Sequence, residues 1–143
     1  MKQLREESGA SIMACRRALE KAKGDIKKAK EYLKEDVGAL AQKTSQRTTS
    51  QGIIASYIHS TKRVGTIIEL HCETDFVANT PQFQQLAFEL ALHIAGMKPA
   101  GVEELLAQPY VRDVSRTVRA LVDETIAAVG ENITVSRFIR YEI

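Results

Sequence analysis

The sequence contains no long apolar run, since no segment approaches the ~18 to 20 consecutive apolar residues that a membrane-spanning helix requires. Its first residues, Met1–Glu7, carry acidic side chains and no apolar stretch, so they indicate neither a secretory signal nor a transit peptide. We therefore expect a cytoplasmic protein without a membrane partner. Hydrophobic residues make up 44% of the 143 residues and charged residues 27%, which is the composition of a folded globular protein.

Cysteine is also scarce. The two cysteines, Cys15 and Cys72, are far apart in the sequence, and a disulfide framework or a zinc site would need more ligands at closer spacing. We expect both to be small buried apolar side chains. His59 and His71 could form a metal-binding or acid–base group with Asp75. Nothing in their spacing supports ligation, so we expect surface histidines and no metal site.

Groups for catalysis are missing as well. The sequence shows no paired nucleophile and base, no glycine-rich phosphate-binding loop and no cluster of metal ligands, so we expect neither an enzyme nor a bound cofactor. The net charge of +2 is unevenly distributed, because residues 1–50 contain 12 Lys or Arg against 7 Asp or Glu. Such a basic front end suits an acidic partner surface. Direct nucleic-acid binding is the alternative, but no aromatic residues alternate with the basic ones and no recognition-helix motif is present.

Residues 1–37 predict a compact module of three short helices. Ser11 is a suitable N-cap for the second helix, and Gly24–Asp25 separates it from the third. Apolar residues recur at helical spacing, as Cys15, Ala18, Leu19 and Ala22 in the second helix and as Ile26, Ala29, Leu33 and Val37 in the third. The module resembles ubiquitin-associated domains, and its small core predicts marginal stability in isolation. Residues 38–51 lose the apolar periodicity and gain Ser and Thr, so we interpret them as a linker.

Residues 52–143 predict a core domain in which a three-stranded antiparallel sheet packs with helices, and the whole chain is therefore of the α+β class. Residues 52–59 are β-branched and aromatic, and residues 64–72 alternate between apolar and polar positions, which is typical of two strands. The short turn between them makes the pair antiparallel. The last strand is expected at Ile133–Ile143, with a bulge or a second covered face where Arg137 interrupts the apolar pattern.

Three helices are expected between these strands. Thr80 and Pro81 can begin the first, which Gly96 would end. A short helix at residues 102–107 must stop before Pro109, because the residue preceding proline avoids helical geometry. Asp113 is expected to cap the third helix. Its apolar stripe would consist of Val114, Val118, Leu121, Val122 and Ile126, and Gly130 would end it.

The connection between the second strand and the first of these helices contains Phe76, which has no evident seat within the chain. One interpretation is that Phe76 staples the loop to the core, since scattered apolar residues near surfaces are normal. The other is that Asp75 and Phe76 form a rigid protruding probe for a partner, because aromatic anchors often dominate binding energy. Ile12 and Met13 lie off the stripe of their helix and offer a similar choice. They either contact the first helix or form an adaptable apolar spot for a partner.

Three segments carry a resemblance to a known family. Cys72–Asn79, with the sequence CETDFVAN, resembles the core signature of bacterial elongation factor Ts, the guanine-nucleotide exchange factor of elongation factor Tu. Ser8–Leu19 resembles the N-terminal signature of that family, and Gly130–Phe138 resembles its C-terminal strand. The segments occur in the order of the family and cover both ends of the chain. The chain is most similar to the short type with a single core subdomain, and Ala100–Pro109 is only a brief bridge where relatives carry a longer insertion.

The resemblance implies a function in translation elongation. The protein would bind the GDP complex of elongation factor Tu, disturb its Mg²⁺ and phosphate site, and promote GDP release so that GTP can bind. The implied probe consists of Thr74, Asp75, Phe76, Val77, Ala78 and Asn79. Ile12, Met13 and Arg16 would dock on the nucleotide-binding domain of the partner. Short members of the family dimerise through the sheet, and because Ile139 occupies the position of their linking cysteine, a noncovalent homodimer is expected.

Overall fold

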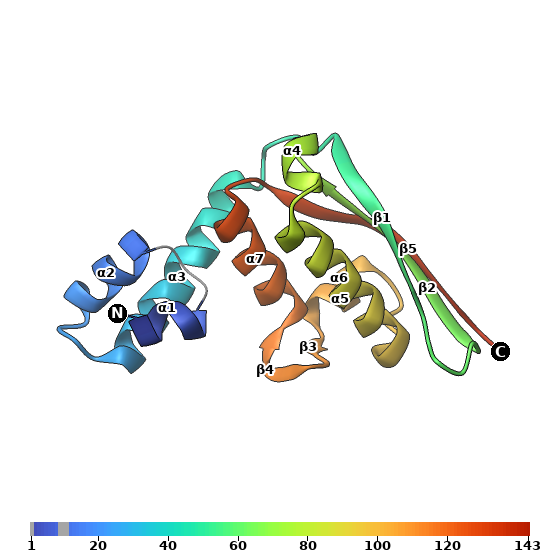
Figure 1. Cartoon of the computed structure of the whole chain (residues 1–143), viewed down its shortest axis with the longest axis horizontal. Helices are drawn as coiled ribbons and strands as arrows, with labels where there is room; N and C mark the ends of the chain where they lie inside the picture. Colours follow the sequence, from blue (N-terminus) through green and yellow to red (C-terminus); the bar gives the residue numbers. More distant parts are fainter. Residues whose placement is uncertain (1, 9–11) are drawn as a thin grey trace.

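The computed structural model describes residues 2–8 and 12–143 and arranges them as an elongated molecule, with a group of helices at one end and a sheet at the other (Figure 1). The helices are α1 (Lys2–Ser8), α2 (Ile12–Lys21), α3 (Ile26–Thr44), α4 (Asp75–Ala78), α5 (Pro81–Met97), α6 (Val102–Ala107) and α7 (Val118–Val129). The strands are β1 (Gln51–Ile58), β2 (Val64–Cys72), β3 (Pro109–Tyr110), β4 (Asp113–Thr117) and β5 (Ile133–Glu142). The predicted α+β class is confirmed. Among the described helices, none is long and apolar enough to cross a membrane.

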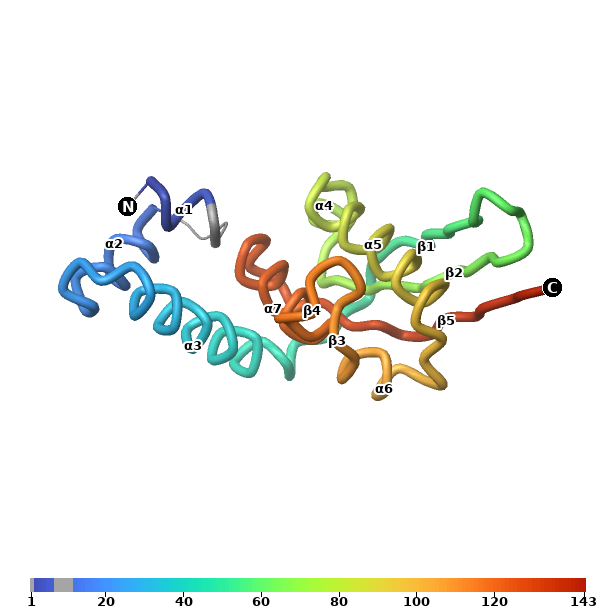
Figure 2. Tube along the Cα trace, turned by 90° about the horizontal axis from the view of Figure 1, so that it is seen from below, coloured from blue at the N-terminus to red at the C-terminus, as the bar shows by residue number. Residues whose placement is uncertain are grey.

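The main sheet has the strand order β1-β2-β5, and both pairings are antiparallel, as predicted. In the central strand β2 the alternation is confirmed, because Thr66, Ile68, Leu70 and Cys72 are buried while Ile67 is exposed. Helix α5 covers the buried face of this sheet, and Figure 2 shows it lying between α7 and the strands. Among the described residues, no helix covers the opposite face of the sheet (Figure 1), and the side chains of Ile54, Ile67 and Ile139 on it are exposed.

The expected bulge in the last strand is present. The pairing of β5 with β2 shifts register between Glu69 and Leu70, so that Arg137 lies opposite Glu69 and Val135 lies opposite Leu70. Ser136 is therefore the additional residue, and Arg137 points into solvent from the uncovered face, where it pairs with Glu69.

Helix α5 is the centre of the larger hydrophobic core. Its stripe of Phe83, Leu86, Leu90 and Ile94 is buried against β2 and α7. The predicted start is confirmed, since the Thr80 hydroxyl accepts a hydrogen bond from the Phe83 amide at 3.3 Å and Pro81 occupies the first turn. The predicted end at Gly96 is wrong. The helix continues to Met97, and Lys98 takes the left-handed conformation with φ 51° and bonds the Ile94 carbonyl.

The first three helices pack around a second, smaller cluster, as expected. Its buried members are Leu4, Cys15, Ala18, Ala22, Ala29 and Leu33. Cys15 belongs to this cluster and Cys72 to the larger core, and both side chains are buried, as predicted. The proposed cap Ser11 lies outside the described residues. The likeness of this module to ubiquitin-associated domains stays a prediction.

Helix α3 is longer than the sequence analysis expected. The segment up to Thr44 is helical, although loss of apolar periodicity predicted a linker from residue 38. Packing explains the difference, because Ala41 and Thr44 are buried where α3 meets α7. The hydroxyl groups are accommodated within the helix, since Thr44 donates to the Ala41 carbonyl at 3.1 Å and Ser45 donates to the Gln42 carbonyl at 2.7 Å. The division of the chain at residues 37 and 51 into module, linker and core domain stays a prediction.

The expected helix start at Asp113 is also wrong. Residues 113–117 form strand β4, which pairs with β3 in a small hairpin, and Val114 is 78% exposed instead of lining a helix stripe. The Asp113 carboxylate is occupied within the hairpin by the amide and hydroxyl of Ser115. Helix α7 begins only at Val118 and is capped by the Thr117 hydroxyl. Its predicted end at Gly130, with φ 77°, is confirmed.

Candidate functional site

The segment Thr74–Asn79, called the knuckle below, forms the single helical turn α4 at the end of β2, at the top of the molecule in Figure 1. Local polar groups hold this turn closed. The Thr74 hydroxyl accepts from the Val77 amide at 3.3 Å, and the Asn79 side-chain amide donates to the Asp75 carbonyl at 2.9 Å. The Thr80 hydroxyl donates to the Val77 carbonyl at 2.7 Å. The turn therefore has a defined shape before it meets any partner.

The knuckle has an inner and an outer side. Val77 and Ala78 are 4% and 5% exposed and belong to the larger core, so they fix the turn to the body of the protein. Asp75 is exposed, and the Phe76 side chain is 80% exposed. The interpretation that Phe76 staples the loop to the core is therefore wrong. A large aromatic side chain projects into solvent from a turn whose neighbours are buried.

The base of the knuckle is tied to the start of β5. The Glu131 carboxylate accepts two hydrogen bonds from Thr74, from the amide at 2.9 Å and from the hydroxyl at 2.7 Å. A second bond joins the same two segments, since the Glu73 carboxylate accepts from the main-chain amide of Asn132 at 3.0 Å. The Asn132 side chain in turn donates to the Arg47 carbonyl at 2.9 Å. None of these four residues outside the knuckle was predicted to have a role, although all but Arg47 lie within the segments that carry the resemblance.

The thiol of Cys72 lies beneath this network. Burial raises the pKa of the Cys72 thiol, and the nearby carboxylates of Glu131 and Glu73 raise it further. The group therefore stays protonated at neutral pH, and its S–H donates to the Thr74 carbonyl at 3.1 Å. Because a thiol is nucleophilic only as the thiolate, this cysteine supports the backbone of the knuckle and offers no reactive sulfur.

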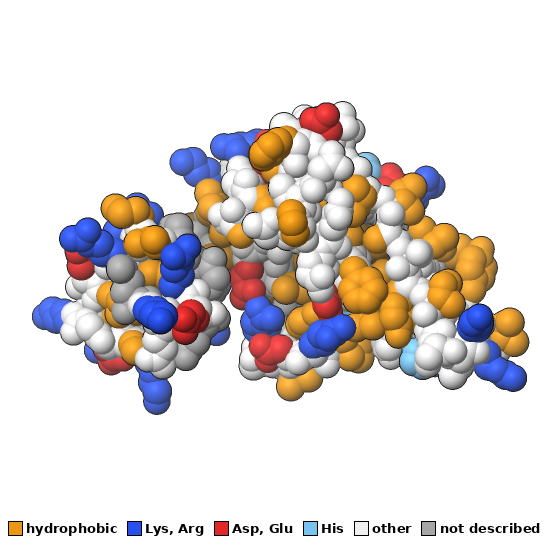
Figure 3. Space-filling view, in the orientation of Figure 1, with side chains coloured by type: hydrophobic (Ala, Val, Ile, Leu, Met, Phe, Trp, Pro, Cys, Tyr) orange, Lys and Arg blue, Asp and Glu red, His pale blue; other side chains and the backbone are white. Residues whose placement is uncertain are grey.

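The predicted residues of the N-terminal module lie on the first turns of α2. Ile12 is 47% and Met13 60% exposed, so both apolar side chains are accessible. Arg16 is exposed as well and pairs with Glu20 at 3.4 Å. Figure 3 shows basic side chains distributed around this module. The structure does not bring α2 and the knuckle together, since the two lie apart in both views of the chain (Figures 1 and 2).

The histidines do not form a metal site in the part of the chain that the structure describes. His59 is exposed and bonds the Tyr57 hydroxyl at 3.0 Å, and His71 bonds Glu69 at 2.7 Å. No group of three or more His, Cys, Asp or Glu side chains among the described residues is arranged to hold a metal ion.

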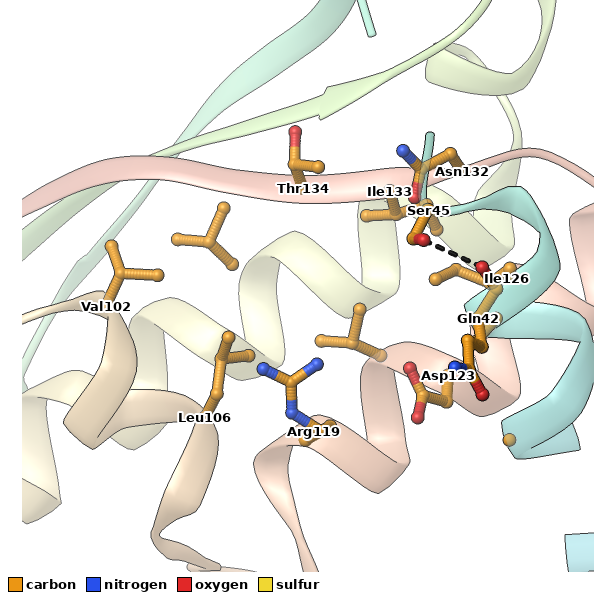
Figure 4. A pocket seen from close by; sticks show the side chains of 14 residues that line it. Gln42, Ser45, Val102, Leu106, Arg119, Asp123, Ile126, Asn132, Ile133 and Thr134 are labelled. Atoms are coloured by element: carbon orange, nitrogen blue, oxygen red, sulfur yellow. Dashed lines mark hydrogen bonds between the residues drawn. The ribbon is translucent and has the colours of Figure 1, made fainter. Parts of the chain in front are cut away.

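A half-open cavity of about 530 Å³ lies between α3, α6, α7 and the start of β5 (Figure 4). Its walls include Val102, Leu106 and Ile126, and its polar rim includes Arg119 and Asp123 from α7. Burial raises the pKa of Asp123, while the positive charge of Arg119 opposes this shift. No feature of the sequence analysis pointed to this cavity.

Comparison with known proteins decides the family. The family model for elongation factor TS matches residues 73–143, a segment that begins at the base of the knuckle. Elongation factor Ts of Coprothermobacter proteolyticus is 40% identical, and the match covers 100% of this chain and 95% of that protein. Elongation factor Ts of Methylacidiphilum infernorum is 38% identical over 100% of this chain and 92% of that protein. The Thermotoga maritima protein of the same name is also 38% identical, with coverage of 100% and 94%.

The chain belongs to the elongation factor Ts family. The match to the Methylacidiphilum elongation factor Ts runs over 186 positions, while this chain has 143 residues, so at least 43 positions of that alignment face gaps here. This agrees with the expectation of a short family member. That the additional residues of the relatives lie between Ala100 and Pro109 stays a prediction.

Proposed function

We propose that this chain is a guanine-nucleotide exchange factor for elongation factor Tu in translation elongation. Exchange on elongation factor Tu is the role of the family to which the chain belongs. The observation that carries the proposal is the exposed Phe76 on a turn that is fixed from behind by Val77 and Ala78. The factor needs no chemistry or cofactor of its own, because it acts only by favouring one state of its partner.

Linkage sets the thermodynamic requirement. The factor by which GDP weakens the complex of the two proteins must equal the factor by which this chain weakens GDP binding. The bound nucleotide depends on Mg²⁺ and on backbone amides that surround its phosphates. A short rigid probe that enters the partner beside this site displaces the elements that hold both. Asp75 and Phe76 are the residues of that probe, and Thr74, Val77, Ala78 and Asn79 keep its shape.

The N-terminal module supplies a second contact in this proposal. Ile12 and Met13 form an accessible apolar spot, and Arg16 lies one turn further along the same helix. Met is well suited to such a surface because its side chain is flexible and polarisable. This contact would bring the module onto the nucleotide-binding domain of the partner, while the knuckle acts at a separate point.

We further propose a noncovalent homodimer through the uncovered face of the sheet. This face carries the exposed side chains of Ile54, Ile67, Ile139 and Tyr141, and Ile67 lies directly opposite Ile139 across the β2–β5 pair. Contiguous apolar surface of this kind is typical of an interaction site. Both cysteines are buried away from it, so no disulfide would link the chains. Light scattering at micromolar concentration should give the mass of a dimer, and Ile139→Glu should give a monomer; a monomeric wild type would refute this part.

The proposed exchange activity is tested by release of a fluorescent GDP analogue from purified elongation factor Tu. We expect strong acceleration by the wild-type chain and loss of most of it in Phe76→Ala, with an unchanged circular dichroism spectrum. Phe88→Ala is the matched control, because Phe88 is a partly exposed aromatic residue on α5 and lies outside the knuckle. No acceleration by the folded wild type would refute the function, whereas a fully active Phe76→Ala would refute the probe.

A further inference from the structure

The orientation of Phe76 is set by the parts of the knuckle that contact the rest of the protein. Phe76 itself is 80% exposed and is absent from both hydrophobic clusters. The orientation of α4 must therefore come from its buried residues and from Thr74, where the strand β2 gives way to the turn. The groups that hold Thr74 in place therefore contribute to the orientation of the Phe76 side chain.

The main-chain amide and the hydroxyl of Thr74 both donate a hydrogen bond to a single side chain, that of Glu131. One oxygen of Glu131 accepts the Thr74 amide and the other accepts its hydroxyl proton, at 2.9 and 2.7 Å. Because that hydroxyl has only one proton, donating it to Glu131 leaves the oxygen lone pairs free to accept the Val77 amide. Glu131 thus holds the backbone before α4 and sets the hydroxyl in the orientation that caps the turn.

Glu131 is itself held on a fixed segment. It follows Gly130, which ends α7, and precedes Asn132, which is buried. The main-chain amide of Asn132 donates to the Glu73 carboxylate, and the side-chain amide of Asn132 donates to the Arg47 carbonyl. A surface carboxylate usually contributes little when its partner is a mobile side chain. Here it makes two charge-assisted bonds, one of them to backbone, and its own backbone is anchored by neighbours.

We propose that Glu131 is a positioning residue for nucleotide exchange, which keeps the knuckle at the angle at which Phe76 enters the partner. This inference rests on the proposed function. Without Glu131, the turn would keep its buried residues and the protein would stay folded, but Phe76 would sample more directions. Restricting Phe76 to one direction on binding then costs free energy, and this cost lowers the exchange rate.

The test compares Glu131→Gln and Glu131→Ala in the fluorescent GDP release assay, over a range of concentrations of the full chain. Glutamine keeps one acceptor oxygen and alanine keeps none. We expect the maximal release rate to fall severalfold for Glu131→Gln and roughly tenfold or more for Glu131→Ala, as follows from losing one or two charge-assisted bonds. Amide hydrogen exchange should become faster at Thr74 in both variants and stay unchanged in α5, which would show that the fold is intact.

Asp113→Asn provides a matched control. One oxygen of its carboxylate accepts both the amide and the hydroxyl of Ser115, at 3.2 and 2.6 Å, and the other oxygen pairs with Arg116, so this carboxylate also binds two groups of one hydroxyl residue. It lies in the β3–β4 hairpin, away from the knuckle (Figure 1). The release rate of Asp113→Asn should therefore equal that of the wild type. An equal loss in this variant would show that the effect of Glu131 is general and would overturn the inference.

A double-variant cycle with Thr74→Val separates positioning from a direct contact with the partner. If Glu131 acts through Thr74, adding Glu131→Ala to Thr74→Val should cause little further loss. Losses that multiply, or a Glu131→Ala variant as fast as the wild type, would overturn the proposal. Where Phe76→Ala is inactive but Glu131→Ala is fully active, the proposed function stands and only the positioning role is wrong. A wild type without activity would refute both.

Discussion

The two hydrophobic clusters of this chain differ in what their side chains can contribute. The larger core buries Phe83, Leu90, Ile94 and other large side chains of α5 between the sheet and α7. The N-terminal cluster, within the described residues, buries two leucines, one cysteine and three alanines. Because burial of apolar area supplies the stabilisation, an alanine-rich cluster gains far less per residue. The knuckle is built on the stronger of the two clusters, while Ile12 and Met13 are carried by the weaker one.

Under the proposed function, the contrast between the two clusters has a meaning. A probe must keep its shape when it is pressed into a partner, so it benefits from a rigid base. An adaptable docking spot tolerates a module that is less stable, because local stability can differ widely within one protein. Helix α3 joins the two regions, since Ala29 and Leu33 belong to the small cluster and Ala41 belongs to the large one.

The largest expected effect is loss of the larger core. Leu90→Ala removes a fully buried side chain beneath the sheet, and a substitution of this kind costs roughly 2 to 5 kcal/mol. Since the sheet, α5 and the knuckle share this core, we expect a lower free energy of unfolding for the whole domain and loss of exchange activity on warming. Urea denaturation followed by circular dichroism measures the change. A variant with wild-type stability would contradict the central place given to α5.

Leu33→Ala is the matched change in the smaller cluster, where Leu33 is 4% exposed. We expect a comparable local cost of roughly 2 to 4 kcal/mol, but confined to α1, α2 and the first half of α3. Amide hydrogen exchange should show faster exchange in those helices while the amides of α5 keep their protection. Equal loss of protection in both regions would mean that the two clusters unfold as one unit, and the contrast between them would be wrong.

A smaller effect is a pH dependence of stability in the region around the larger core. All three histidines lie beyond residue 50, so the protonation of a histidine can change the stability of this region but not that of the N-terminal cluster. His93 is buried, its Nδ1 accepts the Val111 amide at 3.1 Å, and its Nε2 bonds the Gln108 side chain at 2.9 Å. Burial lowers the pKa of His93 below its ordinary value of 6.5, while the bond to Gln108 opposes this shift. The neutral ring is therefore the folded form, and protonation at Nδ1 would break the bond to the β3–β4 hairpin.

The sign follows from proton binding. Below pH 6.5 the unfolded chain binds a proton at this histidine more readily than the folded chain does, so stability is complete above pH 6.5 and falls as the pH is lowered. We expect the free energy of unfolding to be lower at pH 5.5 than at pH 7.5, by at most about 1.4 kcal/mol, because a single proton changes stability by no more than this amount per pH unit below 6.5. Denaturation of the wild type and of His93→Gln at both pH values checks this. An equal pH dependence in the variant would assign the effect to other groups.

Local patterns predicted much of this structure, and non-local contacts explain what they missed. The alternation of β2 and the stripe of α5 were sufficient because each faces one continuous core. The hairpin of β3 and β4 was missed because it depends on Tyr110, whose hydroxyl donates to the buried Glu89 of α5 at 2.6 Å. The role of Glu131 was missed for the same reason, since 57 positions separate it from Thr74. The exposure of Phe76 was one of two interpretations that the sequence left open, because neither neighbouring element had an evident place for this side chain.

The smallest expected effect concerns the joint between the two clusters. Gly38 lies in the interior of α3 and is exposed, and apart from its chain neighbours and the backbone of its own helix no atom lies within 4 Å of the place where a Cβ would stand. Packing therefore does not require a glycine there, and a glycine inside a helix costs roughly 0.5 to 1 kcal/mol relative to alanine. Gly38→Ala should stabilise α3 by about that amount and slow amide hydrogen exchange around residue 38. If α3 transmits order from the strong cluster to the weak one, protection in α1 and α2 should rise as well. Unchanged protection there, with a stabilised α3, would show that the module gains its order only from its own hydrophobic cluster.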